Sequence, residues 1–232
     1  VVTRRLDKLR TSGRHGTATE REQNAREEEL LDRLAPELEE GRPLRELTWS
    51  ADDEYLARGF RFLSQKPQLV VLNLDEDQLP TATTLEAEAQ AAHGGPTRAV
   101  IALGGRIEAE IAALPESEAQ PFLDDLGIVE ASRGRVIRRT YALLGLQSFL
   151  TAGPDECRAW TIPVGATALD AAGVIHSDLA RGFIRAEVVD WNDLVACGSM
   201  AEARRRGLLR SEGKAYVVRD GDVIEVLFNV GR

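Results

Sequence analysis

Two short apolar runs, each followed by a polar or glycine-rich loop, constrain the fold of this chain most. The first run, residues 69–72, stops at Asn73, and a loop with three carboxylates follows. The second run, residues 99–103, stops at Gly104-Gly105. Continuous apolar runs are typical of parallel strands buried on both faces, and the stretch TATTLEAEAQAAH between them predicts a helix. The spacing therefore predicts a βαβ unit whose strands end at one edge of the sheet, where such sheets bind ligands.

The sequence before these runs is highly charged and predicts helices. Residues 1–11 and 20–41 are expected to form two helices around a Gly/Ser/Thr-rich break. The second helix has one apolar stripe, made of Leu30, Leu31, Leu34 and Leu38. Two such helices predict a helical hairpin or a short antiparallel coiled coil. It is either a solvated pair with one packing seam or a docking arm. A third helix is expected over residues 51–65, with Ser50 as its cap.

The second half of the chain has a different pattern. Residues 106–150 predict helices. From residue 151 we expect strands in CRAWTIPVG and GFIRAEVVD, a helix in TALDAAGVI, and short helices in WNDLVACG and SMAEARRRG. The stretch KAYVVRDGDVIEVLFNV predicts two strands around the turn Asp220-Gly221-Asp222. This order indicates a compact mixed sheet crossed by a helix, which fits a β-grasp arrangement.

Charge is unevenly distributed along the chain. Residues 1–132 carry 15 basic and 26 acidic side chains, and residues 133–232 carry 14 and 12. A polyanionic partner would therefore dock on the second half. No apolar run reaches the roughly 18 residues of a membrane span. The two cysteines, Cys157 and Cys197, have neither metal-ligand nor disulfide spacing, which predicts reduced thiols in a cytosolic protein.

The loop after the first apolar run carries hydrogen-bonding groups that suit a purine. In GTPases the corresponding loop is NKxD, whose Asp accepts hydrogen bonds from guanine. Here the loop is Asn73-Leu74-Asp75-Glu76, an NxxE pattern. Guanine offers N1–H and N2–H₂ donors, whereas adenine offers an N6–H₂ donor and an N1 acceptor, so losing the Asp predicts a lower guanine preference. A helix-capping asparagine beside solvated acids is the alternative interpretation. The sequence contains no GxxxxGK[ST] phosphate loop, no HExxH and no GxSxG.

Several stretches of the sequence resemble the YchF family, the Obg-like ATPases. They are FLSQKPQLVVLNLDED, IEAEIAALPESEAQPFLDDLGI, a long stretch from RVIRRTYALLGLQSF to EVVDWNDLV, and EGKAYVVRDGDVIEVLFNV. The resemblance implies an α/β fold: part of the parallel sheet of a P-loop NTPase with a helical, coiled-coil insertion, plus a β-grasp TGS domain. The expected domains are a helical arm at 1–64, the C-terminal part of the nucleotide-binding domain at 65–149, and the TGS domain at 150–232.

The same resemblance implies a function and places residues in it. It implies a ribosome-associated protein that hydrolyses ATP in preference to GTP with Mg²⁺. The adenine would lie at Asn73, Leu74 and Glu76, and Gly104-Gly105 match a second base-side loop. The family's phosphate loop and Mg²⁺ ligands would precede Val1, and the single methionine, Met200, also indicates part of a longer protein. We therefore predict no catalytic residue and no hydrolysis by this chain alone.

Partners are implied for the second half of the chain. TGS domains are associated with RNA or ribosome contact, with the large subunit as the expected site. Arg204, Arg205 and Arg206 fit a phosphate-facing surface, and a solvated helix face is the alternative. A non-catalytic ribosome- or RNA-binding module is the second functional hypothesis. A third, a regulator that senses stress, would need a reactive Cys157 or Cys197.

Overall fold

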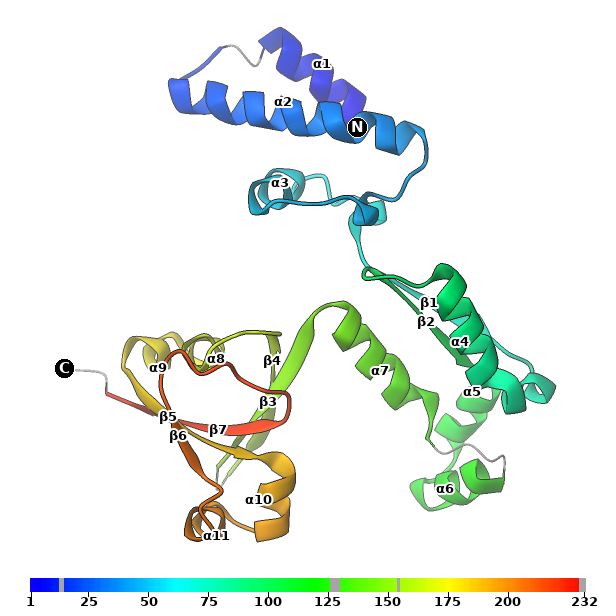
Figure 1. Ribbon diagram of the computed structural model, residues 1–232, viewed down its shortest axis with the longest axis vertical. Coiled ribbons are helices and arrows are strands. Elements are labelled where there is room, and N and C mark those ends of the chain that lie inside the picture. The colour runs from blue at the N-terminus through cyan, green and yellow to red at the C-terminus, as the bar shows by residue number, and fades with distance from the viewer. Residues whose placement is uncertain (13–14, 126–129, 154, 230–232) are drawn as a thin grey trace. The chain divides into compact units, whose positions relative to one another are not determined.

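The computed structural model describes residues 1–12, 15–125, 130–153 and 155–229. The chain divides into two compact units, residues 1–133 and 134–232; Figure 1 follows their elements in chain order. The predicted division into three domains stays a prediction. None of the described helices is both long and apolar enough to cross a membrane.

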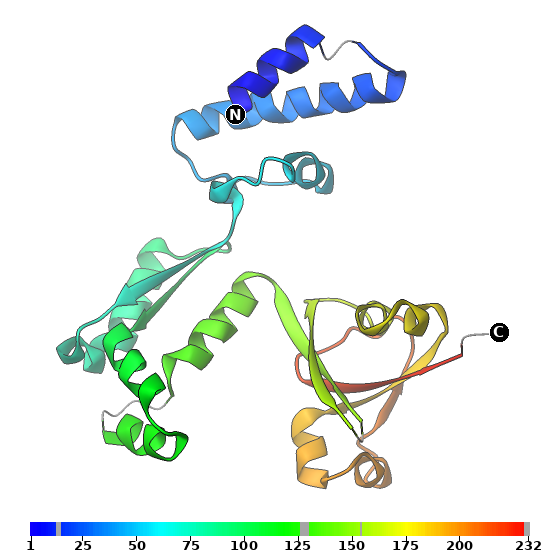
Figure 2. The same ribbon diagram turned by 180° about the vertical axis from the view of Figure 1, so that it is seen from behind.

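The first unit begins with two helices that pack along each other, α1 (Val2–Ser12) and α2 (Ala18–Glu39). Both ribbon views show α1 lying along α2 (Figures 1 and 2). Leu6, Leu9 and Leu31 are buried in the seam between them. Thr17 and Glu20 form a capping box, in which the backbone N–H of Thr17 donates to the Glu20 carboxylate at 2.8 Å. The predicted helical pair and packing seam are therefore present.

A shorter helix than predicted follows this pair. The segment contains η1 (Leu44–Glu46), α3 (Ala51–Ala57) and η2 (Leu63–Gln65). Ser50 caps α3 as expected, with its hydroxyl accepting from the backbone N–H of Asp53 at 3.1 Å. The prediction of one helix to residue 65 is wrong. The α-helix ends at Ala57, and Arg61 adopts a φ of 50°, in the left-handed region.

The βαβ unit is present as predicted. Strand β1 (Gln68–Asn73) is followed by η3 (Glu76–Thr81), α4 (Ala82–His93) and β2 (Arg98–Leu103). The two strands pair in parallel with a register from Gln68↔Arg98 to Asn73↔Leu103. Helices α5 (Gly105–Ala113) and α6 (Glu116–Asp125) complete this part of the unit.

The expectation that both strands are buried on both faces is wrong for β1. Val100, Ile101 and Ala102 of β2 have no exposed surface, whereas Val71 of β1 is 47% exposed. The reason is the position of β1 in the sheet. Among the described residues this sheet has only two strands, and α4 packs against β2 rather than β1. An apolar run alone does not distinguish a central strand from a half-covered one.

The second unit is a five-stranded mixed sheet with helices on both faces. Its elements are α7 (Ser132–Leu143), β3 (Leu146–Ala152), β4 (Cys157–Pro163), α8 (Ala168–Ile175), α9 (Ser177–Arg181), β5 (Phe183–Asp190), α10 (Trp191–Cys197), α11 (Met200–Arg205), β6 (Arg210–Glu212) and β7 (Asp222–Phe228). The strand order is β4-β3-β7-β5-β6. Phe149, Ala171 and Ile224 lie in a core on the α8 side, and Val189, Ala203 and Val223 lie in a second core with α10 and α11. The predicted mixed sheet with a crossing helix is therefore present.

Two predictions about this unit are wrong: one helix ends earlier than expected, and one expected strand does not form. The helix expected up to residue 150 ends at Leu143, and β3 starts at Leu146. Residues 214–219, expected to form the first strand of a hairpin, do not form a strand. Val218 and Tyr216 instead bond the chain at the start of α8, since the Val218 N–H donates to the carbonyl of Ala166 at 3.0 Å and the Ala168 N–H donates to the carbonyl of Tyr216 at 2.8 Å. Tertiary pairing with this segment replaces the predicted hairpin.

Candidate base-recognition site

The candidate site lies where the two parallel strands of the first unit end. Asn73 ends β1 opposite Leu103, which ends β2. The pairing continues one residue further, because the backbone N–H of Leu74 donates to the carbonyl of Leu103 at 2.9 Å. The chain then enters η3 after β1 and α5 after β2. The two loops predicted to approach a base therefore lie side by side.

Asn73 joins these two loops through its side chain. Its Oδ1 accepts a hydrogen bond from the backbone N–H of Gly105 at 2.9 Å. This N–H belongs to the first turn of α5, whose donors have no partner within the helix. Because the amide oxygen is used in this way, its nitrogen provides the donors that Asn73 can offer to a ligand.

The two glycines allow the loops to approach closely. A Cβ atom added to Gly105 would lie 2.9 Å from Asn73 Oδ1, and one added to Gly104 would lie 3.0 Å from Leu79 Cδ2. Both distances are shorter than ordinary contacts of a Cβ atom. A larger residue at Gly105 would displace the Asn73 side chain from its position, and one at Gly104 would require the Leu79 side chain to shift slightly.

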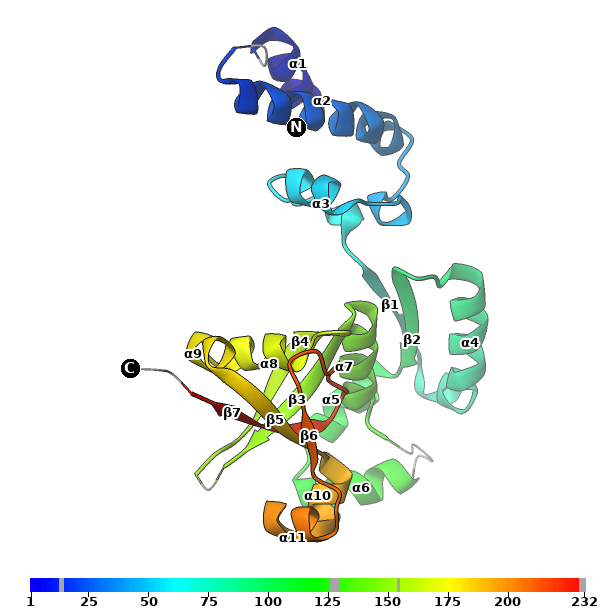
Figure 3. The ribbon, with the colours of Figure 1, turned by 60° about the vertical axis from the view of Figure 1, so that its left-hand side comes forward.

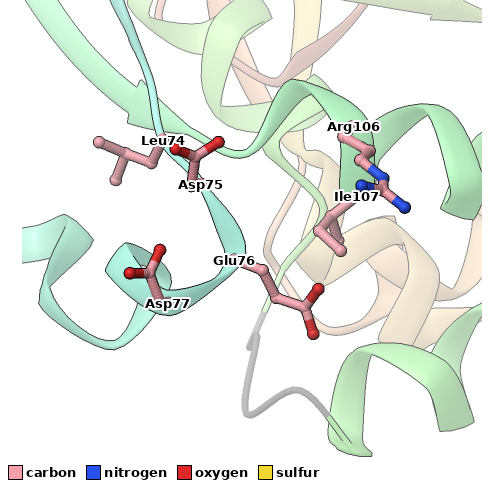
Figure 4. A pocket seen from close by; sticks show the side chains of 6 residues that line it. All are labelled: Leu74, Asp75, Glu76, Asp77, Arg106 and Ile107. Atoms are coloured by element: carbon pink, nitrogen blue, oxygen red, sulfur yellow. The ribbon is translucent and has the colours of Figure 1, made fainter.

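An open hollow of about 670 Å³ adjoins these loops. It is lined by Leu74, Asp75, Glu76, Asp77, Arg106 and Ile107. Figure 4 shows that Glu76 from the start of η3 and Arg106 and Ile107 from the start of α5 extend into the same space. Leu74 and Ile107 provide apolar surface, and Glu76 provides an exposed carboxylate. This combination suits a flat ring with hydrogen-bonding edges.

The charge of the hollow argues against a phosphate ligand. Three carboxylates and one guanidinium line it, and Arg106 is itself 3.2 Å from Glu110, its neighbour one turn along α5. A phosphate would meet more negative than positive charge there. A neutral ring that donates hydrogen bonds to a carboxylate fits better.

The predicted residues divide into two groups in the structure. Leu74 and Glu76 line the hollow, while Asn73, Gly104 and Gly105 form the joint between the loops beside it. Sequence analysis missed Arg106 and Ile107 as lining residues. Their position directly after Gly104-Gly105, at the start of a helix, was the available signal.

The predicted arginine cluster lies in the second unit, on and after α11. Each of its three side chains contacts a carboxylate: Arg204 pairs with Glu187, while Arg205 and Arg206 pair with Glu202 at 2.7 Å and 2.6 Å. These hydrogen bonds lower the pKa of Glu202 and raise the pKa of both arginines. The cluster therefore has less free positive charge than its sequence indicates.

A metal ion would need several side chains that can bind it close together. Within the described ranges, no group of three or more His, Cys, Asp or Glu side chains could hold a metal ion. The acidic loop after β1 therefore does not fit a Mg²⁺ site of its own, because Mg²⁺ needs several oxygen ligands in octahedral geometry.

Comparisons with known proteins find similar sequences over most of this chain. Residues 146–229 match the family described as YchF-GTPase_C, a protein of unknown function (DUF933). The Ribosome-binding ATPase YchF of Bacillus subtilis (strain 168) is 43% identical over 204 residues, which cover 87% of this chain and 56% of that protein. The protein of the same name from Escherichia coli O157:H7 is 42% identical over 202 residues, covering 87% and 55%.

The resemblance to the YchF family is confirmed. A solved structure agrees with it: the Schizosaccharomyces pombe YchF GTPase is 25% identical, with a TM-score of 0.76 over 97% of this chain and 61% of that one. This chain spans about half the length of the curated YchF relatives it matches. The names of these YchF proteins include both ATPase and GTPase.

Proposed function

We propose that the loops after β1 and β2 recognise the adenine base of ATP in a ribosome-associated nucleotidase of the YchF type. The observation that carries this proposal is the Asn73–Gly105 hydrogen bond, which fixes the orientation of the Asn73 amide. Its nitrogen is then the group that can donate to the N7 acceptor of a purine. Leu74 and Ile107 would contact the faces of the ring.

The neighbouring carboxylate supplies the base preference in this proposal. On the purine edge that carries N7, adenine has an N6–H₂ donor, whereas guanine has the O6 acceptor. With Asn73 at N7, the Glu76 carboxylate would accept from N6–H₂ of adenine. Against guanine it would face O6, and two acceptors repel each other. An unpaired polar group of this kind costs about 1–3 kcal/mol, which corresponds to roughly 5- to 150-fold in affinity.

Hydrolysis is proposed for the full-length protein only. The described residues include no group of three or more His, Cys, Asp or Glu side chains that could hold a metal ion, and the sequence contains no GxxxxGK[ST] phosphate loop, so we derive no chemical step from them. The relatives named Ribosome-binding ATPase support ATP and a ribosomal partner. Mg²⁺ as the cofactor and the cytoplasm as the location are further parts of this proposal. Residues 150–232 would act as the TGS domain of such a protein, with the helical arm of residues 1–64 beside the nucleotide-binding part.

A second candidate is a ribosome- or RNA-binding module without hydrolysis. It is favoured by the exposed arginines at Arg204, Arg205 and Arg206, whose side chains are 63%, 78% and 53% exposed. Their pairing with Glu187 and Glu202 means that a phosphate would have to compete with carboxylates for them. The two candidates differ in whether the base site is used.

Nuclear magnetic resonance of the isotope-labelled chain tests the base site. We expect adenosine nucleotides to shift the amide resonances of residues 73–76 and 104–107. Glu76→Gln should weaken these shifts, and Glu88→Gln, an exposed carboxylate on α4, should leave them unchanged. Shifts elsewhere, or equal effects of both variants, would contradict the proposed site.

A further inference from the structure

In the second unit, the neighbouring strands β3 and β7 separate after a short contact. Leu150↔Val223 is the single register pair between them in the described residues, and the Gly221 N–H donates to the Ser148 carbonyl at 2.8 Å. Beyond this point β7 pairs with β5 as far as Phe228, while β3 pairs with β4 as far as Ala152. The two arrows point in clearly different directions (Figure 3).

The separation leaves an apolar hollow of about 1110 Å³ between the strands. Thr151 and Trp160 line one wall, and Ile224 and Val226 of β7 line the other. The Trp160 indole N–H donates to the Thr151 hydroxyl at 3.0 Å, which fixes the ring in the wall. Leu179 of α9 and Leu194 of α10 also line the hollow.

The edge of β7 that faces this hollow carries backbone hydrogen-bonding groups. In an antiparallel pair such as β5 and β7, alternate residues direct their N–H and C=O groups away from the partner strand. Residues 224–228 have no register partner on the β3 side among the described residues. At about 3.3 Å per residue they span roughly 16 Å, the length of a short strand. A strand edge without a pairing partner is a template for another strand.

The charges at the hollow are acidic. The two charged residues that line it are Glu156 and Glu225. Glu225 lies opposite Glu187 on β5; Glu187 is paired with Arg185 and Arg204, whereas Glu225 has no ion-pair partner among the described residues. Arg158, the nearby cation on β4, stacks on the Trp160 ring at 4.3 Å. This arrangement favours a cationic ligand and disfavours the phosphates of RNA.

We propose that this hollow binds an extended peptide segment that adds to the edge of β7 and alternates apolar with Lys or Arg side chains. Backbone hydrogen bonds to residues 224–228 would hold the segment, as in other cases of strand addition. Its apolar side chains would pack on Trp160 and Leu179, and a basic side chain would reach Glu225. The site lies in the sheet of the second unit and does not depend on the proposed base site.

The test uses the whole chain, labelled with ¹⁵N, and the peptide acetyl-Val-Lys-Val-Lys-Val-amide. We expect shifts of the amides of residues 151–153 and 224–228 and of the Trp160 indole. A peptide with Glu in place of Lys, and one N-methylated at alternate amides, should each bind at least about tenfold more weakly. Glu225→Gln should weaken binding about fivefold. Glu212→Gln should not change it, because Glu212 is on β6, which is separated from β7 by β5.

Several results would overturn the proposal. One is the absence of binding at millimolar peptide concentration. Another is binding that survives N-methylation, because strand pairing needs the amide donors. A third is equal binding of the Lys and Glu peptides. A short oligouridine that shifts the resonances of residues 224–228 when the peptide does not would instead assign the surface to RNA.

Discussion

The side-chain oxygen of Asn73 accepts a hydrogen bond at 2.9 Å from the backbone N–H of Gly105, 32 residues further along the chain, and so connects the ends of two parallel strands. Replacing Asn73 by Ala should leave this N–H at the start of α5 without its partner. We expect a loss of about 1 kcal/mol in unfolding free energy and a loss of nucleotide binding. Asn73→Asp keeps the acceptor but removes the amide donors.

The two variants therefore separate stability from recognition. Urea unfolding should show Asn73→Asp close to wild type and Asn73→Ala destabilised, while nucleotide titration should show both impaired. If Asn73→Asp binds the nucleotide as tightly as wild type does, the Asn73 amide does not donate to the base.

A second prediction concerns the buried carboxylate of Asp222, whose side chain is 3% exposed. It accepts from the Tyr216 hydroxyl at 2.8 Å, from the Arg219 N–H at 2.8 Å and from Arg210 Nη2 at 3.2 Å. Asp222→Ala should destabilise the second unit by about 3–5 kcal/mol, because it leaves a charge and two donors without their partner. Tyr216→Phe should cost about 1 kcal/mol, since Asp222 keeps its other two donors.

Thermal unfolding of both variants measures whether Asp222→Ala loses more stability than Tyr216→Phe. Burial and the bond to Asp222 also raise the pKa of Tyr216. A larger loss for Tyr216→Phe than for Asp222→Ala would show that the carboxylate is not the centre of the cluster.

A third prediction concerns acid stability at the start of α3. A hydrogen bond from Arg33, and bonds from the Ser50 N–H and hydroxyl, lower the pKa of Asp53 from its ordinary 3.8. A carboxyl whose pKa is lower in the folded state stabilises the fold above its unfolded pKa, and this contribution is lost as the pH falls through the folded pKa. Asp53→Asn should therefore cost about 1 kcal/mol near neutral pH, and the difference should shrink below about pH 4.

Urea unfolding of Asp53→Asn between about pH 6 and about pH 3 measures this dependence. Asp52→Asn is the matched control, because the Asp52 side chain is 80% exposed. A difference from wild type that stays constant over this range would contradict the assignment to Asp53.

A fourth prediction concerns the arginines at the end of α11. Glu202 holds both Arg205 and Arg206, so Glu202→Gln should free them and strengthen binding to RNA or ribosomes by several-fold. Replacing Arg204, Arg205 and Arg206 by Ala should weaken binding and reduce its salt dependence. Filter binding at two salt concentrations checks both variants, and an unchanged salt slope in the triple variant would exclude the cluster as the docking face.

The sequence predicted the elements whose signals are local. The apolar runs ending at Asn73 and Leu103 predicted the βαβ unit, and Ser50 predicted a helix cap; both are present. The errors concern which segments pair with each other and which strands are covered by other parts of the chain. Nothing local distinguishes the half-exposed β1 from the buried β2, or shows that Val218 bonds Ala166 rather than a hairpin partner. These features depend on contacts between distant segments.

For the candidate site too, the sequence predicted the local features and not those that depend on distant contacts. Asn73, Leu74 and Glu76 follow a strand, and this position indicated a ligand rim. The orientation of the Asn73 amide depends on Gly105, in the loop after the other strand. The pairing of Arg205 and Arg206 with Glu202 is local, at three and four residues, and helical spacing could have indicated it.

Paired titrations with ATP and GTP test most directly whether Asn73 and Glu76 select adenine. We expect the wild-type chain to bind ATP at least about fivefold more tightly than GTP. Glu76→Asp, which shortens the carboxylate side chain by one methylene, should reduce this ratio about fivefold, and Glu88→Gln should leave it unchanged. Tighter binding of GTP than of ATP by the wild-type chain would contradict the account.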